Sequence, residues 1–392
     1  MSVHELALQR SKYKHLSDDE WRWFLQQVEG RERTADKLPT FAAIPDWWYP
    51  VRLSCEQCSS ELTARYKTSL VNGEKMVDLT AGYGVDTCFL SEHFAHADYV
   101  EQNPELCRIA AHNFANKPIT IHNSTAENFL TSAGQYDLIF LDPARRDSHG
   151  GKVFRLEDCT PNVVELLTEL LKHGKRLMLK LSPMLDITQA LSRLSSLNSP
   201  LSWDIHVVAV KNEVKEILLL SRYLEVSKSR SLDISTPSSI TCIDLSAPDQ
   251  SFVFTREEEF NSANGLTGVA GLTSNSVSGL YLYEPSAAIL KAGAYKLIAQ
   301  RFNLTKLDVN THLYVSDTLI PDFPGRVWQI EEIINHKLQI ENANVLVRNY
   351  PLTPDQLKKK LHLRDGGTAF IIGCRVAGKP TLFRAQRVAR DD

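Results

Sequence analysis

The fold is set by residues 76–86, MVDLTAGYGVD, where a short apolar run ends in a turn that contains two glycines. Two later stretches repeat this pattern: residues 97–103 read ADYVEQN, and residues 136–146 read YDLIFLDPARR. Short apolar runs that are bounded by small or polar residues are typical of buried parallel strands. Parallel sheets bind their ligands at the carboxyl ends of the strands. The three stretches therefore predict an α/β fold, a doubly wound sheet with a ligand site where these strands end.

The central part of the chain continues the alternation of strands and helices. Apolar runs predict strands, in chain order, at 75–79, 97–101, 119–123, 137–141 and 175–181. Helix-like segments lie between them, which implies parallel strands joined by right-handed crossovers. Two further runs, 203–210 and 214–221, are separated by only three residues and are predicted to pair as a hairpin. We therefore expect an antiparallel hairpin to close the sheet.

The turn after the first strand has the composition of a ligand-binding loop. Gly82 and Gly84 allow the backbone to turn tightly, so that a ligand can approach the amide groups. A dinucleotide-binding loop would have a third glycine at the position of Thr87. The carboxylate of Asp78 suits a cationic ammonium group better than a pyrophosphate; a purely structural turn is the alternative. Cofactor-binding roles are predicted for Asp78, Thr80, Ala81, Gly82 and Gly84.

Glu101 ends the second strand and lies nineteen residues after Gly82. A carboxylate at this position can accept hydrogen bonds from both ribose hydroxyls of an adenosine cofactor. NAD enzymes use the same arrangement, so Glu101 indicates a nucleoside cofactor without identifying it; an exposed strand-end glutamate is the alternative. The neighbouring Gln102 is expected at the same cofactor, and Asn123 and Ala126 are expected near its adenine.

The most selective feature follows the fourth strand, where Asp142-Pro143-Ala144-Arg145 resembles the D/N-P-P-x motif of class I methyltransferases that modify nucleobases or planar amides. Asp142 and the Pro143 carbonyl can each accept a hydrogen bond from a target N–H group, which aligns its lone pair for methyl transfer. A plain Asp-Pro turn is the alternative. Catalytic roles are predicted for Asp142, Pro143 and Arg145.

Arg145 leaves the acceptor atom open. Amine methyltransferases with this motif usually have an aromatic residue there, whereas arginine can stack on a base and can also bind phosphate. RNA uridine-C5 methyltransferases have a D-P-P-R version, and Gln57-Cys58-Ser59 loosely resembles their Q-x-N segment. Those enzymes need a late cysteine nucleophile, and Cys242 lacks the expected surroundings. Gln57 and Ser59 are predicted to line the cofactor pocket, with helix capping as the alternative for the serines.

The remaining segments frame this region. Four domains are predicted: a helical segment (1–50), a catalytic domain (51–225), a connecting region (226–324) and a small α/β domain (325–392). Ser17 is a predicted N-cap, a helix is expected to begin at Pro285, and Thr353 is expected to cap another helix. Residues 145–159 are a candidate lid. At the end of the fifth strand and just after it, Lys180, Ser182 and Asp186 are expected to face the same crevice, with a structural role as the alternative.

Charge and cysteine content limit the alternatives. The net charge is −3, which does not suit a generic nucleic-acid binder, although from residue 355 onward nine Lys and Arg face four Asp. This basic tail could contact phosphate or could be a solvated surface. Cys55 and Cys58 form a lone C-x-x-C without the second half of a zinc site, so no metal is expected. Membrane helices and a signal peptide are not indicated, which makes the cytoplasm the default location.

Several motifs together resemble one bacterial family: EQCSSELTARYK, DLTAGYGVDT, EQNPELCRIA, LDPARRD, YLYEPSAAILKAGA and the GGTAFII tail. It is the class I S-adenosyl-L-methionine (SAM)-dependent methyltransferase family with a C-terminal THUMP-like domain, and the resemblance covers nearly the whole chain. It implies a Rossmann-like class I methyltransferase sheet with SAM as cofactor. THUMP domains generally present RNA, often tRNA, to an attached catalytic domain, so the resemblance also implies a base in tRNA or rRNA as the target, and no membrane partner.

Two other functions stay open at the level of the sequence. The acidic net charge slightly favours a SAM-dependent methyltransferase that acts on a protein or a small molecule. A protein that binds SAM or RNA without turnover is the other alternative.

Overall fold

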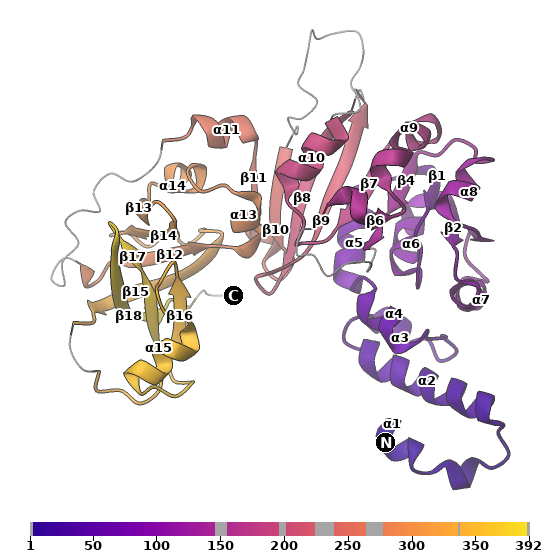
Figure 1. Cartoon of the computed structure of the whole chain (residues 1–392), viewed down its shortest axis with the longest axis horizontal. Coiled ribbons are helices and arrows are strands. Elements are labelled where there is room, and N and C mark those ends of the chain that lie inside the picture. The colour runs from indigo at the N-terminus through magenta and orange to yellow at the C-terminus, as the bar shows by residue number, and fades with distance from the viewer. Residues whose placement is uncertain are drawn as a thin grey trace. The chain divides into compact units, whose positions relative to one another are not determined.

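The structure, a computed structural model, describes most of the chain: residues 3–145, 155–195, 201–223, 239–263, 277–335 and 338–389, with Arg145 and Tyr223 described by their backbone alone. The chain divides into two compact units (Figure 1). The first is Met1–Ile205 with Glu216–Thr236, and the second is His206–Lys215 with Pro237–Asp392. The four domains expected from the sequence remain a prediction.

The first unit is built on strands that follow one another in the order β8-β9-β7-β4-β1-β2-β3 within a nine-stranded sheet, although residues His206–Lys215 of β8 and β9 fall in the second unit. Its strands are β1 (Gly73–Asp78), β2 (Phe94–Glu101), β3 (Ile119–Asn123), β4 (Leu138–Leu141), β7 (Leu177–Leu181), β8 (Leu201–Val210) and β9 (Glu213–Tyr223). Strand β1 pairs in parallel with β2 and β4, and β7 continues the parallel order next to β4. Strand β9 runs antiparallel to β7, which confirms the predicted closing hairpin.

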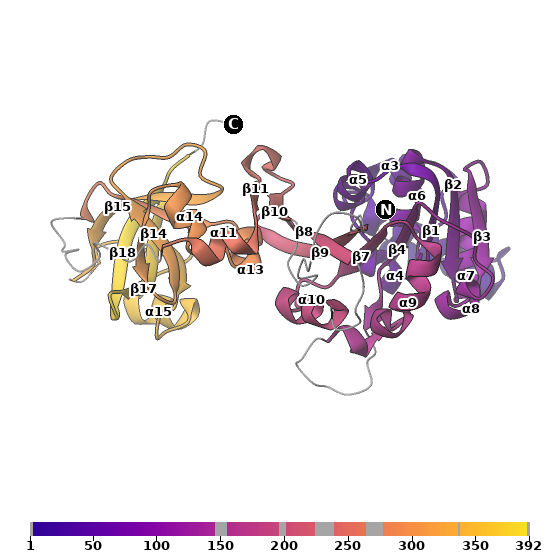
Figure 2. The ribbon, with the colours of Figure 1, turned by 90° about the horizontal axis from the view of Figure 1, so that it is seen from above.

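Helices cover both faces of this sheet (Figure 2). On one face lie α5 (Glu61–Ser69) and α6 (Val85–Leu90), and on the other lie α9 (Val163–His173) and α10 (Ile187–Ser195). Two further helices, α7 (Pro104–Asn113) and α8 (Ala126–Leu130), follow β2 and β3. Side-chain caps fix where several helices begin: Asn103 caps α7 and Asn162 caps α9. Helix α6 is short, because a 3₁₀ turn (Ser91–His93) follows it and leads into β2 at Phe94.

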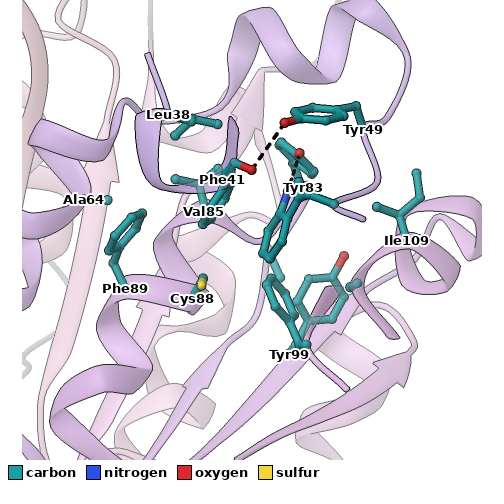
Figure 3. Packing of buried hydrophobic residues seen from close by; sticks show 14 of the residues in the cluster. Leu38, Phe41, Tyr49, Ala64, Tyr83, Val85, Cys88, Phe89, Tyr99 and Ile109 are labelled. Atoms are coloured by element: carbon teal, nitrogen blue, oxygen red, sulfur yellow. Dashed lines mark hydrogen bonds between the residues drawn. The ribbon is translucent and has the colours of Figure 1, made fainter. Parts of the chain in front are cut away.

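The N-terminal helices share a hydrophobic core with the sheet. They are α1 (Val3–Ala7), α2 (Asp18–Thr34), α3 (Pro39–Ala42) and α4 (Arg52–Gln57), with a 3₁₀ turn at Arg10–Tyr13. Ser17 caps α2 through a capping box with Glu20, as predicted. Phe41 from α3 packs with Tyr83 and Phe89, which come from the glycine loop and α6 (Figure 3). Residues of the N-terminal segment therefore pack against the glycine loop.

The second unit contains a sheet with the order β13-β14-β12-β15-β18-β17-β16. These strands are β12 (Tyr281–Pro285), β13 (Thr305–Asp308), β14 (Thr311–Ser316), β15 (Gly325–Ile333), β16 (Asn344–Arg348), β17 (Ala369–Val376) and β18 (Lys379–Arg387). The unit also contains β10 (Ser239–Asp244), β11 (Phe252–Phe254) and α11 (Arg256–Asn261). The buried carboxylate of Glu284 on β12 binds Arg326 of β15 and Arg348 of β16, which ties three strands of the sheet together.

The helices of the second unit differ in part from the prediction. The expected helix start at Pro285 is wrong, because Pro285 ends β12 and α13 (Ala287–Ala292) begins after it. Gly293 then ends α13 in a left-handed conformation, with φ of 82°, before α14 (Leu297–Arg301). Thr353 caps α15 (Pro354–Leu361), as predicted. Within the described residues, no helix is both long and apolar enough to cross a membrane.

Candidate functional site

A cavity of about 300 Å³ opens at the carboxyl ends of β1, β2 and β4 in the first unit. Its walls come from the glycine loop, from the segment between α4 and α5, and from the turns after β2, β3 and β4. Eleven of the residues predicted from the sequence line it: Gln57, Ser59, Asp78, Thr80, Ala81, Gly82, Gly84, Glu101, Gln102, Ala126 and Asp142. Residues that are far apart in the sequence are thus brought together around one space.

The glycine loop is held in a shape that other residues would not adopt easily. Gly82 and Gly84 both have positive φ, at 56° and 82°. A Cβ atom at Gly84 would lie 2.7 Å from Cε2 of Phe114, so a side chain is excluded there. The loop can therefore come close to a ligand and also pack tightly against the core behind it.

Asp78 braces this loop from the end of β1. One carboxylate oxygen accepts a hydrogen bond from the backbone N–H of Thr80 (3.0 Å), and the other accepts one from the hydroxyl of Thr87 (2.6 Å). Thr87 thus stands where a dinucleotide-binding loop would have a glycine, and its hydroxyl has a structural role. Burial raises the pKa of Asp78 to about 7. A bound cation beside Asp78 would favour the ionised carboxylate.

Glu101 connects the end of β2 to the glycine loop. Its carboxylate accepts hydrogen bonds from the backbone N–H of Gly82 (3.0 Å) and from that of Asn103 (2.7 Å). A carboxylate has about four lone-pair positions, so these two bonds leave capacity for the hydroxyls of a ribose. The glycine loop and the predicted ribose-binding group are therefore fixed relative to each other before any ligand arrives.

Asn123 lies just behind this wall and is not among the lining residues. Its side-chain amide donates to the backbone carbonyls of Glu101 and Gln102, at 3.0 Å each. The amide thus fixes the strand end that carries Glu101. The turn that follows β3 does reach the cavity, through Ser124, Thr125, Ala126 and Glu127.

Asp142 faces the cavity at the end of β4. Its backbone N–H donates to the hydroxyl of Thr80 (2.6 Å), which joins the turn after β4 to the glycine loop. Pro143 follows it and is not among the lining residues. The backbone of Arg145 pairs with Cys159 in a short two-stranded ribbon, β5 (Ala144–Arg145) and β6 (Cys159–Thr160). The Arg145 side chain and residues 146–154 of the candidate lid lie outside the described residues.

The segment before the glycine loop resolves the two interpretations of its serines. Ser60 caps α5, accepting from the N–H of Thr63 at 3.2 Å. Ser59 is buried against the cavity, and its hydroxyl donates to Asp86 at 2.6 Å. Of the C-x-x-C pair, Cys55 is buried and Cys58 is half-buried, and burial raises the pKa of both thiols. Cys242 is also buried, in β10, and does not line the cavity.

A buried charge cluster behind Asp142 was largely missed from the sequence. The Lys67 ammonium, fully buried in α5, binds Glu216 on β9 (2.6 Å) and Asp86 at the start of α6 (3.2 Å). Lys180, at the end of β7, binds Asp142 (2.5 Å) and lies 3.5 Å from Asp86. Lys180 is a candidate from the sequence because it lies near the end of the strand predicted at 175–181. Lys67, Asp86 and Glu216 carried no comparable signal.

The electrostatics of the cluster follow from burial and from charge pairing. Burial opposes the charged form of Asp86, but Lys67 and Lys180 outweigh it and hold the pKa below its usual range. Burial raises the pKa of Glu216 despite the same two lysines. Asp186 is not part of this cluster, because its carboxylate accepts from the N–H of Gln189 (2.8 Å) at the start of α10.

The residues around the cavity fit SAM. A backbone loop without side chains at Gly82 and Gly84 admits close approach, and the buried Asp78 offers a carboxylate to a cationic ammonium. Glu101 offers acceptors to a ribose at the neighbouring strand end. The arrangement therefore matches an amino-acid end and a nucleoside end on one ligand.

Comparisons with known proteins identify relatives that match this chain over most of its length. The crystal structure of a proposed methyltransferase from Porphyromonas gingivalis W83 shares 32% sequence identity with this chain and superposes with a TM-score of 0.80, covering 95% of this chain and 92% of the other. An uncharacterized S-adenosylmethionine-dependent methyltransferase of Mycobacterium tuberculosis H37Rv is 23% identical over 366 residues, 90% of this chain and 92% of the relative.

The C-terminal part also matches two domain families. A ferredoxin-like domain family matches residues 281–324, and a THUMP domain-like family matches residues 325–387. These two segments supply the strands of the second unit's sheet, from β12 to β18. The chain belongs to the class I SAM-dependent methyltransferase family that carries a C-terminal THUMP-like domain.

Proposed function

We propose that this SAM-dependent methyltransferase modifies a base in structured RNA, tRNA or rRNA. The observation that carries the proposal is the THUMP domain-like match over residues 325–387, in the same chain as the methyl-transfer cavity. THUMP domains generally present RNA to an attached catalytic domain, and a target base would leave its stack to reach Asp142 at the cavity.

The charge on the C-terminal domain supports an RNA partner once the ion pairs are taken into account. Several of its basic side chains already form ion pairs: Arg326 and Arg348 share Glu284, Lys358 pairs with Asp365, and Arg384 pairs with Glu331. Lys359, Lys360 and Lys379 are exposed and form no ion pair with the described residues. These side chains remain available for backbone phosphates.

The proposed roles divide the cavity into two parts. Asp78, Thr80, Ala81, Gly82 and Gly84, with Gln57 and Ser59 from the opposite wall, would hold the amino-acid end of the cofactor. Glu101 and Gln102 would hold its ribose, and the turn at Ala126 its adenine, with Asn123 as support. When bound, SAM supplies a methyl group that is activated by attachment to a positively charged sulfur. Asp142, the Pro143 carbonyl and Arg145 would orient the acceptor.

The test follows the methyl group from labelled SAM. The full chain is incubated with methyl-labelled SAM and, in parallel, with RNA, with protein and with the small-molecule fraction from cells that lack its gene. The proposal predicts label in RNA that depends on Asp142. Label that accumulates only in protein or in small molecules would overturn the RNA assignment, and no transfer to any of the pools would favour a binding protein without turnover.

A further inference from the structure

Lys180 lines the cavity and contacts the carboxylates of both Asp142 and Asp86. Its ammonium lies 2.5 Å from Oδ2 of Asp142 and 3.5 Å from Oδ2 of Asp86, and its side chain is 12% exposed. The Asp142 side chain in front of it is 39% exposed. Lys180 therefore sits at the inner end of the cavity, directly behind the carboxylate that is proposed to bind the acceptor.

Asp86 already has a cation of its own. The buried Lys67 ammonium lies 3.2 Å from the other carboxylate oxygen of Asp86 and also binds Glu216. Lys180 is thus a second cation, and its shortest ion pair is with Asp142. Burial opposes its charged form, but the carboxylates of Asp142, Asp86 and Glu216 outweigh burial and raise the pKa of Lys180. The ammonium stays protonated at neutral pH.

Two hydrogen-bonding positions remain open between these side chains. An ammonium has three N–H donors, and Lys180 has described partners for two of them, Asp142 and Asp86. Within the described residues, Oδ1 of Asp142 has no hydrogen-bond partner, because Lys180 binds Oδ2. Both residues line the cavity. A donor and an acceptor therefore lie next to each other where the acceptor base is expected.

We propose that Lys180 and Asp142 together bind the acceptor base through a ring N–H and its adjacent carbonyl, so that the methylated atom is an amide-type ring nitrogen, as in guanine or uracil. This inference rests on the proposed RNA function. It makes Lys180 a residue that contacts the acceptor, and it names the class of atom that the sequence left open.

The charge of Lys180 selects this class over an exocyclic amine. The lone pair of an amide-type ring nitrogen is delocalised, so this nitrogen becomes nucleophilic as its proton leaves, and negative charge develops on the carbonyl oxygen. An ammonium that donates to this oxygen stabilises the developing charge. Methylation of an amine builds positive charge on nitrogen, which a neighbouring ammonium opposes.

The reaction balances without a further reactant. At the acceptor, the N–H bond breaks and an N–C bond forms; in the cofactor, the S–C bond breaks and the sulfur becomes neutral. The released proton passes to Oδ1 of Asp142 and then to water. Lys180 keeps its own proton throughout.

The first test identifies the product. RNA from cells that lack the gene is treated with the full chain and SAM carrying a deuterated methyl group, then digested to nucleosides for mass spectrometry. Deuterated N1-methylguanosine or N3-methyluridine is the expected product. A methyl group on an exocyclic amine, a carbon atom or a ribose would overturn the ring-amide inference while leaving the RNA function intact. Label found only in protein would overturn the RNA function itself, and the inference with it.

The second test asks what Lys180 does. In Lys180→Met, we expect kcat to fall about 100-fold and its pH profile to move to higher pH, because the ring N–H loses the cation that eases its deprotonation. The Kd for SAM, measured by calorimetry, and the Tm report whether the cavity is intact. Lys180→Arg should recover part of the rate and of the pH profile. The matched control is Lys175→Met, which removes an exposed lysine just before β7 that pairs with Asp137. A wild-type rate and pH profile in Lys180→Met would overturn the assignment, as would a Lys180→Arg variant that folds and binds SAM but is no more active than Lys180→Met.

Discussion

Asp78 lies where β1 meets the glycine loop, and its burial has a consequence that can be measured. Burial raises its pKa from 3.8 to about 7 in the folded protein. Between these two values the folded state holds a proton that the unfolded state has released. The free energy of unfolding therefore falls as the pH rises through this window, as far as Asp78 alone contributes.

From this shift we predict that SAM affinity increases about tenfold between pH 5.5 and pH 7, because the cofactor's ammonium favours the ionised form of Asp78. Calorimetry in two buffers of different ionisation enthalpy measures both the affinity and the proton released on binding. Asp78→Asn should bind more weakly, with little pH dependence in this range. A pH dependence in Asp78→Asn that equals that of the wild type would assign the effect to another group.

Single residues could be read from the sequence when they follow a recognisable strand. Asp78, Glu101 and Asp142 each end an apolar run, so the topology alone predicts that they meet. Lys67 and Glu216 are 149 positions apart and look like surface residues of a helix and a strand. Only the three-dimensional packing reveals that they form a buried ion pair.

Among the elements, the glycine loop and α6 depend on Gly84. Two features oppose a side chain at this position: the φ of 82°, and the 2.7 Å distance between an added Cβ and Cε2 of Phe114. We predict that Gly84→Ala lowers the free energy of unfolding by about 2 kcal/mol, mainly through the left-handed backbone and the clash, and that it weakens SAM binding. Thermal unfolding measures the first effect. Gly134→Ala is the matched control, because an added Cβ there has no neighbour within 4 Å; equal losses in both variants would contradict this role for Gly84.

The buried ion pair between Lys67 of α5 and Glu216 of β9 is predicted to stabilise the contact between this helix and the sheet. Lys67→Met leaves Glu216 and Asp86 without their closest cation, and removing one partner of a buried pair costs about 3 kcal/mol or more. Denaturant unfolding should reveal this loss. Lys172→Met removes an exposed lysine that pairs with Glu169, and we expect a change within about 0.5 kcal/mol. Lys67→Met with wild-type stability would show that the cluster does not hold the sheet and helix together.

At the scale of the whole molecule, the sequence predicted the first unit better than the second. Alternating strands and helices with sharp boundaries gave the parallel sheet and its closing hairpin. Residues 281–324 fall within the predicted connecting region, whose bounds stay a prediction. The structure forms β12, β13 and β14 there, and these strands join those of the THUMP-like segment in one sheet. These strands are short, and the buried Glu284 that ties them to β15 and β16 looks polar in the sequence.

The exposed lysines of α15 are predicted to contact RNA phosphates. Lys359→Glu with Lys360→Glu in the full chain should weaken RNA binding similarly for all sequences and reduce its dependence on salt, because phosphate contacts release counterions. SAM affinity should not change. Filter binding at several salt concentrations measures both quantities for RNA. Lys12→Glu with Lys14→Glu, two exposed lysines of the N-terminal segment, is the control with the same change in net charge; equal effects in the two variants would indicate that only overall charge matters.

We propose that two parts of the cavity have different roles: the glycine loop binds the cofactor, and Asp142 orients the acceptor. The most direct measurement is single-turnover transfer of labelled methyl from saturating SAM to RNA by wild type and by Asp142→Asn, with the Kd for SAM determined for both. We predict that transfer falls at least about 100-fold in the variant while the Kd stays within about threefold. Transfer at the wild-type rate by Asp142→Asn would contradict the account.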